Sequence, residues 1–177
     1  MKALFSLTVL ALLLSVPAPA LAQDTRDVRL ADDVARALVG YARLSIFDHI
    51  GARVENGVVV LDGKVTMPFK KDDLGTRVGR IDGVRSVRNE IAILPVSQFD
   101  DELRYKVARA IYGNQSFWTY AAMVNPPIHI IVERGHVTLA GVVNSNVERT
   151  LARSLATGLG ELSVTNTLKT DADAKSD

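Results

Sequence analysis

The chain has 177 residues, of which 47% are hydrophobic and 23% are charged, and it contains no cysteine. Lysine and arginine number 21 against 20 aspartates and glutamates, so the formal net charge is +1. This composition is too ordinary for a disordered chain and lacks the basic excess of a general nucleic-acid binder. The absence of cysteine excludes a disulfide scaffold, a thiolate metal site and a catalytic thiol.

Residues 1–22 have the pattern of a secretory signal peptide. Lys2 supplies a positive charge, residues 3–16 form an uncharged apolar run, and the small-x-small pattern Ala20-Leu21-Ala22 follows two prolines. The apolar run of about 14 residues is shorter than a bilayer span, which disfavours a retained anchor. We expect cleavage after Ala22, export to the periplasm, and a mature chain of 155 residues without net charge or transmembrane span.

The remaining chain contains an internal repeat. The segment RVENGVVVLDGKV at 53–65 aligns with IVERGHVTLAGVV at 131–143, at an offset of 78 residues. Upstream, an offset of 73 aligns VARAL at 34–38 with VARAI at 107–111. Farther along, an offset of 77 aligns Gly83, Val87 and Asn89 with Gly160, Val164 and Asn166. Two tandem modules explain this pattern better than one large domain.

The first module, expected at residues 26–94, begins with an amphipathic helix. Apolar residues recur at helical spacing across Asp27–Leu44. Alternating apolar residues at 50–54 and 59–65 predict two strands, joined at Asn56-Gly57 by a tight turn with positive φ at both positions. A second helix is expected after Pro68, ending near Gly83, and a closing strand at 87–93.

The second module, expected at residues 99–169 before a polar tail at 170–177, repeats this order. A helix starts near Asp100, strands at 128–132 and 137–143 flank the turn Arg134-Gly135, and Ser145 caps the next helix in a Ser-x-x-Glu box. The segment Ser163–Leu168 closes the sheet. The sequence therefore predicts an α+β fold of two tandem αββαβ modules, each a small three-stranded sheet with two helices on one face.

The repeated strand motif resembles that of a known family. It reads Gly57-x-Val59-x-Leu61-x-Gly63-x-Val65, followed by Val87-x-Asn89-x-Ile91, and recurs from Gly135 to Leu168. This pattern is similar to the BON family of exported bacterial osmotic-stress-type proteins, over about Val28 to Leu168. The resemblance implies phospholipid binding or envelope maintenance without a known catalytic site. Because the shared residues are glycines and core aliphatics, it implies a fold rather than a chemistry.

The sequence contains no recognisable catalytic or metal site. The serines of the mature chain lie outside the motifs of nucleophilic catalysis. The three histidines, His49, His129 and His136, lack the further ligands that would complete a zinc cage. We therefore expect a protein that is not an enzyme and has neither a metal nor another cofactor.

Several polar residues have a structural interpretation. Lys70-Lys71 with Asp72-Asp73, and the acidic run Asp100-Asp101-Glu102, are typical of solvated helix starts. Asn89 and Asn166 occupy matched positions at the end of the closing strands. We expect each asparagine to make a structural hydrogen bond rather than to contact a ligand.

The second module carries an aromatic-rich insert at 113–127, GNQSFWTYAAMVNPP. Tryptophan and tyrosine suit a membrane–water interface because the ring is apolar while its NH or OH stays hydrated. An alternative is that Phe117 and Trp118 cap the small core or fill the space between modules. The candidate lipid- or partner-binding residues on this insert and the preceding helix are Arg104, Arg109, Tyr112, Phe117, Trp118 and Tyr120.

These observations predict a non-enzymatic periplasmic protein that contacts the phospholipid membrane surface and supports envelope integrity or the stress response. Its expected partners are anionic phospholipids or envelope proteins, and not nucleic acid. An alternative is a protein–protein interaction adaptor within the bacterial cell envelope. The sequence leaves the identity of the ligand and the oligomeric state open.

Overall fold

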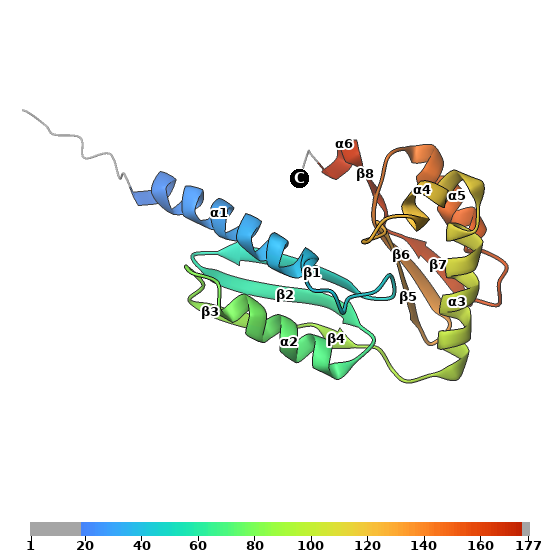
Figure 1. Cartoon of the computed structure of the whole chain (residues 1–177), viewed down its shortest axis with the longest axis horizontal. Helices are drawn as coiled ribbons and strands as arrows, with labels where there is room; N and C mark the ends of the chain where they lie inside the picture. The colour runs from blue at the N-terminus through green and yellow to red at the C-terminus, as the bar shows by residue number, and fades with distance from the viewer. Residues whose placement is uncertain (1–18, 175–177) are drawn as a thin grey trace, which may run out of the picture.

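The computed structural model describes residues 19–174, which form two α+β modules in tandem (Figure 1). The signal peptide expected at residues 1–22 lies largely outside the described residues. Within residues 19–174, no helix has both the length and the apolar character needed to cross a membrane. The first module consists of α1 (Pro19–Val39), β1 (His49–Glu55), β2 (Val58–Val65), α2 (Pro68–Gly79), β3 (Ser86–Asn89) and β4 (Ala92–Ile93).

The second module repeats these elements and adds two short helices in the insert. It consists of α3 (Gln98–Tyr112), the 3₁₀ helix η1 (Gln115–Phe117), α4 (Trp118–Ala121), β5 (Ile128–Glu133), β6 (His136–Val143), α5 (Asn146–Leu155), β7 (Ser163–Asn166), β8 (Lys169–Thr170) and α6 (Asp171–Ala174). The tail expected from residue 170 thus begins in a short strand and a single helical turn.

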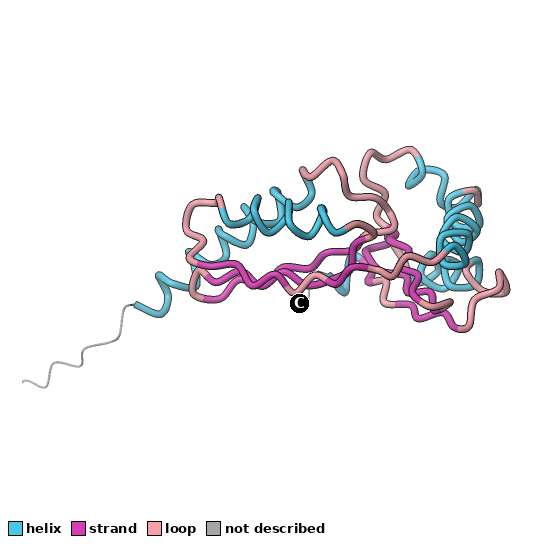
Figure 2. The backbone as a smooth tube through the Cα atoms, turned by 90° about the horizontal axis from the view of Figure 1, so that it is seen from below, coloured by secondary structure: helices cyan, strands magenta, loops and turns pink. Residues whose placement is uncertain are grey.

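The two sheets have the same topology. The second strand of each module is central: β2 pairs antiparallel with β1 and parallel with β3, and β6 pairs likewise with β5 and β7. The helices α1 and α2 lie together on one side of the first sheet (Figure 2). The expected fold of two αββαβ modules is confirmed.

Each module has its own apolar core. In the first, Leu30, Val34 and Leu38 of α1 pack with the inward residues of β2 and α2. In the second, fourteen buried residues form the main cluster, which includes Phe117 and Tyr120 from the insert. The larger second core therefore incorporates part of the aromatic segment.

The expected closing strand at 87–93 is divided into β3 and β4. The side-chain oxygen of Asn89 accepts a bond from the amide of Ile91, and its side-chain nitrogen donates to the carbonyl of Lys71. Asn166 makes the same two bonds, from Leu168 and to Arg149. The structural role expected for these asparagines is confirmed, and each one stabilises the break in its strand.

Two glycine positions in each hairpin follow from backbone geometry. The turn residues Asn56 and Gly57 have φ values of 53° and 75°, as expected for this turn. Farther along β2, Gly63 has φ of 114°, and a Cβ there would lie 2.1 Å from the carbonyl oxygen of His49. Gly141 on β6 likewise has a positive φ, and a Cβ there would clash with the carbonyl oxygen of Pro127. The glycines of the repeated motif are therefore required by the fold.

The first helix ends earlier than the apolar spacing predicts. We expected a helix to Leu44, but α1 ends at Val39, and residues 40–48 form a loop. Glycine at position 40 disfavours helix, and beyond it Tyr41 and Leu44 pack against the first core while Ile46 and Phe47 pack against the second. The apolar residues of this junction loop (residues 40–48) therefore do not continue a helical face.

Candidate binding surface and module junction

The six candidate residues do not share one exposed surface. Arg109 and Trp118 are exposed, and Tyr112 is half-buried. Arg104, Phe117 and Tyr120 are buried. The expectation that all six face a lipid or a partner is therefore corrected for the three buried side chains, whose atoms are committed to the protein interior.

Phe117 and Tyr120 hold the insert against the second core. Their ring centroids are 6.0 Å apart, and Phe117 is fully buried. The hydroxyl of Tyr120 donates to Glu148 at 2.7 Å and accepts from the amide of Asn144 at 3.1 Å. Burial, reinforced by the bond to Glu148, raises the pKa of Tyr120 to about 12, so the hydroxyl stays protonated. The core-capping alternative thus holds for Phe117, while Trp118 is exposed.

Ser145 caps α5, but the expected capping box is only half formed. Its hydroxyl accepts from the amide of Glu148 at 3.2 Å. The Glu148 carboxylate accepts from the amide of Asn144 instead of that of the cap residue. This arrangement leaves Glu148 facing Tyr120, which connects the insert to α5.

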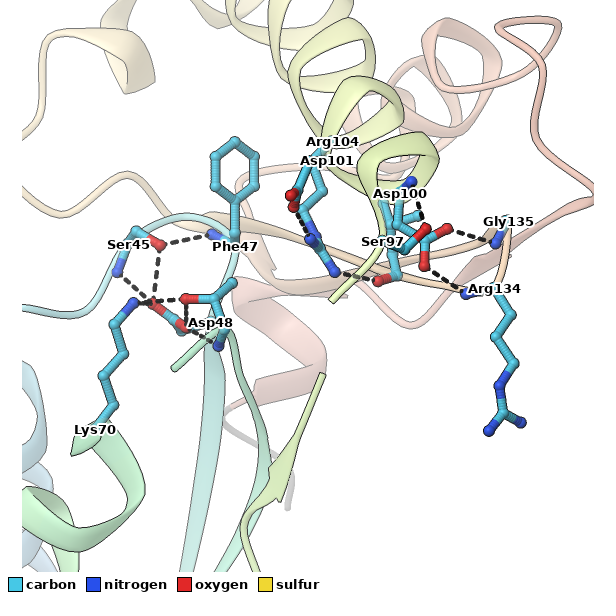
Figure 3. Close-up of polar contacts among 12 residues, drawn as sticks. Ser45, Phe47, Asp48, Lys70, Ser97, Asp100, Asp101, Arg104, Arg134 and Gly135 are labelled. Carbon is cyan, nitrogen blue, oxygen red and sulfur yellow. Dashed lines mark hydrogen bonds and ion pairs between the residues drawn. The ribbon is translucent and has the colours of Figure 1, made fainter. Parts of the chain in front are cut away.

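Arg104 is an interior residue with only 4% of its surface exposed. Its guanidinium donates to the carbonyl oxygen of Val132 at 2.7 Å and forms an ion pair with Asp101 (Figure 3). Its Nε is buried without a hydrogen-bond partner, but a side chain buried and paired in this way does not face lipid headgroups. Of the two arginines proposed for α3, only Arg109 is available at the surface.

Tyr112 fastens the end of α3 to the start of β5. Its hydroxyl donates to the carbonyl oxygen of Ile128 at 2.5 Å and accepts from the amide of the same residue at 3.2 Å. Burial raises the pKa of Tyr112, so it remains a neutral hydrogen-bonding group. The half-buried ring therefore positions both ends of the insert.

The exposed part of the insert is apolar. Trp118 is 68% exposed, Met123 is 48% exposed and Val124 is 95% exposed. No residue between 113 and 127 is charged. We call these three side chains the insert tip. Phe117 and Tyr120 of the same segment are buried in the second core, so the insert is anchored to the module.

An aspartate on the first helix of each module holds the hairpin turn of that module. Asp100 is buried and accepts from the amides of Arg134 and Gly135, both at 2.8 Å (Figure 3). Its counterpart Asp27 accepts from Asn56 and Gly57 at 2.6 and 3.1 Å. The solvated interpretation of Asp100 is thus wrong, because a turn with two consecutive positive φ values leaves its amides directed at this carboxylate.

Lys70 is a second charged residue whose solvated interpretation is wrong, because it is buried and has a structural role. It is buried and donates to Asp48 at 2.6 Å. Asp48 is 1% exposed and also accepts from the backbone and hydroxyl groups of Ser45 and Thr66 (Figure 3). Although burial alone would raise the pKa of Asp48, these bonds lower it. This ion pair fixes the junction loop.

The junction loop joins the two modules. The carbonyl oxygen of Ile46 accepts from the amide of Ile130 on β5 at 2.7 Å. Phe47 packs edge-on against Tyr105 of α3, with ring centroids 5.3 Å apart at 81°. Lys64 and Glu133 add an ion pair between the sheets. Apolar packing and backbone hydrogen bonding therefore both hold the modules together.

One histidine from each module meets at this junction. The ring centroids of His49 and His129 lie 5.3 Å apart. Burial lowers the pKa of both, and mutual repulsion lowers that of His129 further, against an opposing effect of Asp48. Among residues 19–174, no group of three or more His, Cys, Asp or Glu side chains is arranged to hold a metal ion. The sequence did not indicate this pairing, because it depends on how the modules dock.

A cavity of about 560 Å³ opens beside the histidines. The end of α1, the junction loop and the start of β1 form one wall, and residues 124–127 with parts of β5 and β6 form the other. Its lining is mainly aliphatic, including Leu38, Leu44, Ile46, Ile50, Val124 and Pro127. Its volume is in the range typical of small-ligand sites.

The family model for the BON domain matches residues 26–95 and 100–172, which together make up most of the chain. The chain belongs to the BON domain family. BON domains occur in exported and periplasmic proteins, and the family is known for phospholipid or membrane binding and is not an enzymatic family. The two matched regions coincide with the two repeated modules of the structure.

Two solved structures show weak similarity to this BON protein. Both are of CdsD, a structural protein of the type III secretion system of Chlamydia trachomatis. The C-terminal domain of CdsD is 16% identical, with 70% of this chain and 57% of that chain covered, at a TM-score of 0.30. The other CdsD structure is 15% identical, with 80% and 92% covered, at a TM-score of 0.29. These TM-scores are too low to support an inference, and no curated protein matches the chain in sequence.

Proposed function

We propose that this BON protein binds the surface of phospholipid membranes in the bacterial envelope, through the insert tip of its second module. The observation that carries this proposal is the exposure of Trp118, Met123 and Val124 on a segment without charge. A water-exposed apolar tip on a firmly anchored base is suited to partial insertion into the interfacial region of a bilayer.

The proposed contact is weak and reversible. Full burial of an aliphatic or methionine side chain contributes about 1.5–3 kcal/mol, and tryptophan favours the headgroup level. Arg104 is already neutralised by Asp101, so Arg109 is the one arginine of the candidate set left to face anionic headgroups. We therefore expect anionic lipid to strengthen binding only modestly, with an effect that salt screens.

Flotation with phosphatidylcholine vesicles, with and without phosphatidylglycerol, tests this proposal. Trp118 is the only tryptophan, so its emission reports directly on the tip. We expect the wild-type protein to float with vesicles and its emission to shift to the blue. Trp118→Ser should reduce flotation, whereas Leu162→Ser, which changes a similarly exposed residue outside the insert, should not.

Two results would overturn the membrane proposal. One is the absence of both flotation and a blue shift at low salt. The other is equal flotation of the Trp118→Ser and wild-type proteins, which would mean that vesicle binding uses another surface. Circular dichroism of each variant establishes that the fold is retained.

A further inference from the structure

The cavity at the module junction continues along the first module. A second hollow of about 230 Å³ lies between α1 and β1. The two hollows share Leu38, Val39 and Ile50 in their linings. We call the combined space the junction groove. Along β1, the stretch from Ile50 to Val54 alone spans roughly 13 Å at the usual rise per strand residue, so the groove is elongated.

A comparison of the two modules explains why this groove lies in the first. Ala31 and Val39 of α1 correspond to Arg104 and Tyr112 of α3, at the helix offset of 73 residues. Arg104 and Tyr112 reach across to the backbone of β5, where they donate to Val132 and Ile128. The smaller side chains of the first module leave this space between helix and edge strand open.

On the strand side of the groove, the first module also has a smaller side chain than the second. Ala52 on β1 corresponds to Ile130 on β5, at the strand offset of 78 residues. Ile130 is fully buried in the second module, whereas Ala52 is exposed and lines the hollow. The two modules share one fold, but at three equivalent positions the first has smaller side chains than the second. These are Ala31, Val39 and Ala52 in the first module.

The lining of the groove is almost free of charge. The α1–β1 hollow is lined only by alanine, valine, leucine and isoleucine. In the main cavity the charged residue is Asp48, whose carboxylate is committed to Lys70 and the junction loop. His49, His129 and Asn125 give this end its remaining polar groups, apart from Ser45. A long apolar space with a few polar groups at one end matches an amphiphile with a linear aliphatic chain.

We propose that the junction groove binds a single acyl chain of a membrane lipid, an inference that rests on the proposed membrane function. Val124 belongs both to the insert tip and to the cavity lining. A chain that leaves the bilayer at the tip therefore enters the groove without crossing a charged surface. The groove takes up the chain, while the tip makes the first contact with the membrane.

Titration with 11-(dansylamino)undecanoic acid below its micellar concentration, without vesicles, tests the groove separately from membrane binding. We expect saturable binding with one probe per protein and blue-shifted dansyl emission. Val39→Tyr and Ala52→Ile introduce the side chains that fill the corresponding positions of the second module, so the fold should accept them. Each should weaken probe binding about tenfold or more, because it occupies the space that the chain needs.

Arg36→Tyr is the matched control, because it adds the same side chain to an exposed position of α1 that does not line the groove. It should change probe affinity less than about twofold. Non-saturable probe binding, or equal affinity in Val39→Tyr, Ala52→Ile and wild type, would rule out the groove as the site. Thermal unfolding of each variant separates loss of binding from loss of fold.

A second arm distinguishes a membrane lipid from a free fatty acid as the source of the chain. Protein incubated with phosphatidylglycerol vesicles and re-isolated should carry phospholipid, detected by mass spectrometry, and Val39→Tyr should carry less. Probe binding without phospholipid recovery would indicate a free-acid site and overturn the lipid assignment. Trp118→Ser should float less with vesicles but keep probe binding, so a failure of the tip and a failure of the groove give different results.

Discussion

The backbone amide of Ile130 donates to the carbonyl oxygen of Ile46, across the boundary between the two modules, at 2.7 Å. Ile130 lies on β5, the edge strand of the second sheet, and an unpaired edge is a template for unwanted strand pairing. The junction loop therefore protects this edge while it joins the modules. Ile46 and Phe47 also contribute apolar packing to the second core.

Phe47→Ala should weaken the coupling between the modules. Phe47 is half-buried and contacts Tyr105 edge-on, so we expect a loss of about 1–2 kcal/mol, less than for a fully buried phenylalanine. Urea unfolding of the whole protein measures this loss. Phe99→Ala, which removes a more exposed ring that lies beside Gly135, should cost less. Equal costs for the two variants would contradict the proposed role of Phe47.

Asp48→Asn should destabilise the first module by about 3–5 kcal/mol, because it leaves the buried Lys70 ammonium without its charged partner. The double variant Asp48→Asn/Lys70→Met should recover part of this loss, since it removes the stranded charge as well. Urea denaturation of the single and double variants gives the comparison. A double variant that is less stable than Asp48→Asn would show that the stranded charge is not the cause.

Asp100→Ala should cost about 2–4 kcal/mol, because it removes two hydrogen bonds from backbone amides to a buried carboxylate. Asp27→Ala removes the equivalent pair at a half-buried site and should cost less. Thermal unfolding monitored by circular dichroism checks both values. Glu102→Ala, at an exposed position on α3, should stay within about 0.5 kcal/mol of wild type.

Acidification should loosen the module junction. The pKa values of His49 and His129 are lowered in the docked state, mainly by burial, so the separated modules bind more protons than the docked ones. Docking is therefore fully stable above the unperturbed histidine pKa of 6.5 and weakens as the pH falls below it. Asp62 near His49 and Asp48 near His129 oppose the shift without reversing it. Asp48 itself has a lowered pKa, so its own contribution is lost only below about pH 4.

The hydrogen-exchange protection factor of the Ile130 amide measures this docking directly. We expect lower protection at about pH 5 than at about pH 7.5, because the amide is covered only when the junction loop is in place. His129→Phe keeps a ring at this position but cannot be protonated, so its protection should depend less on pH. A pH dependence unchanged in His129→Phe would exclude this histidine as the source.

Local signals in the sequence predicted much of the fold. The repeat, the strand alternation and the Asn56-Gly57 turn each depend on neighbouring residues, and the structure has the expected αββαβ order in both modules. The predicted end of α1 was wrong, since the apolar residues after Val39 lie in a loop and divide between the two cores. Periodicity alone does not identify which core an apolar residue joins.

The burial of the candidate binding residues also depends on tertiary packing. The local excess of aromatic residues identified the insert. It did not distinguish the neighbouring Phe117 and Trp118, of which tertiary packing buries the first and leaves the second exposed. The environment of charged residues was the hardest feature to predict from the sequence. Arg104, Lys70 and Asp100 all have interior partners far along the chain.

Near-neighbour patterns in the sequence were enough to define two similar modules and most of their helices, strands and tight turns, because periodicity and turn chemistry act over a few residues. How the modules meet is a property of the folded molecule. The pairing of Ile46 with Ile130, the meeting of His49 with His129, and the groove left open by Ala31 and Ala52 all join residues distant in the chain. Such contacts depend on the complementary shapes of two folded surfaces, which neither segment specifies alone.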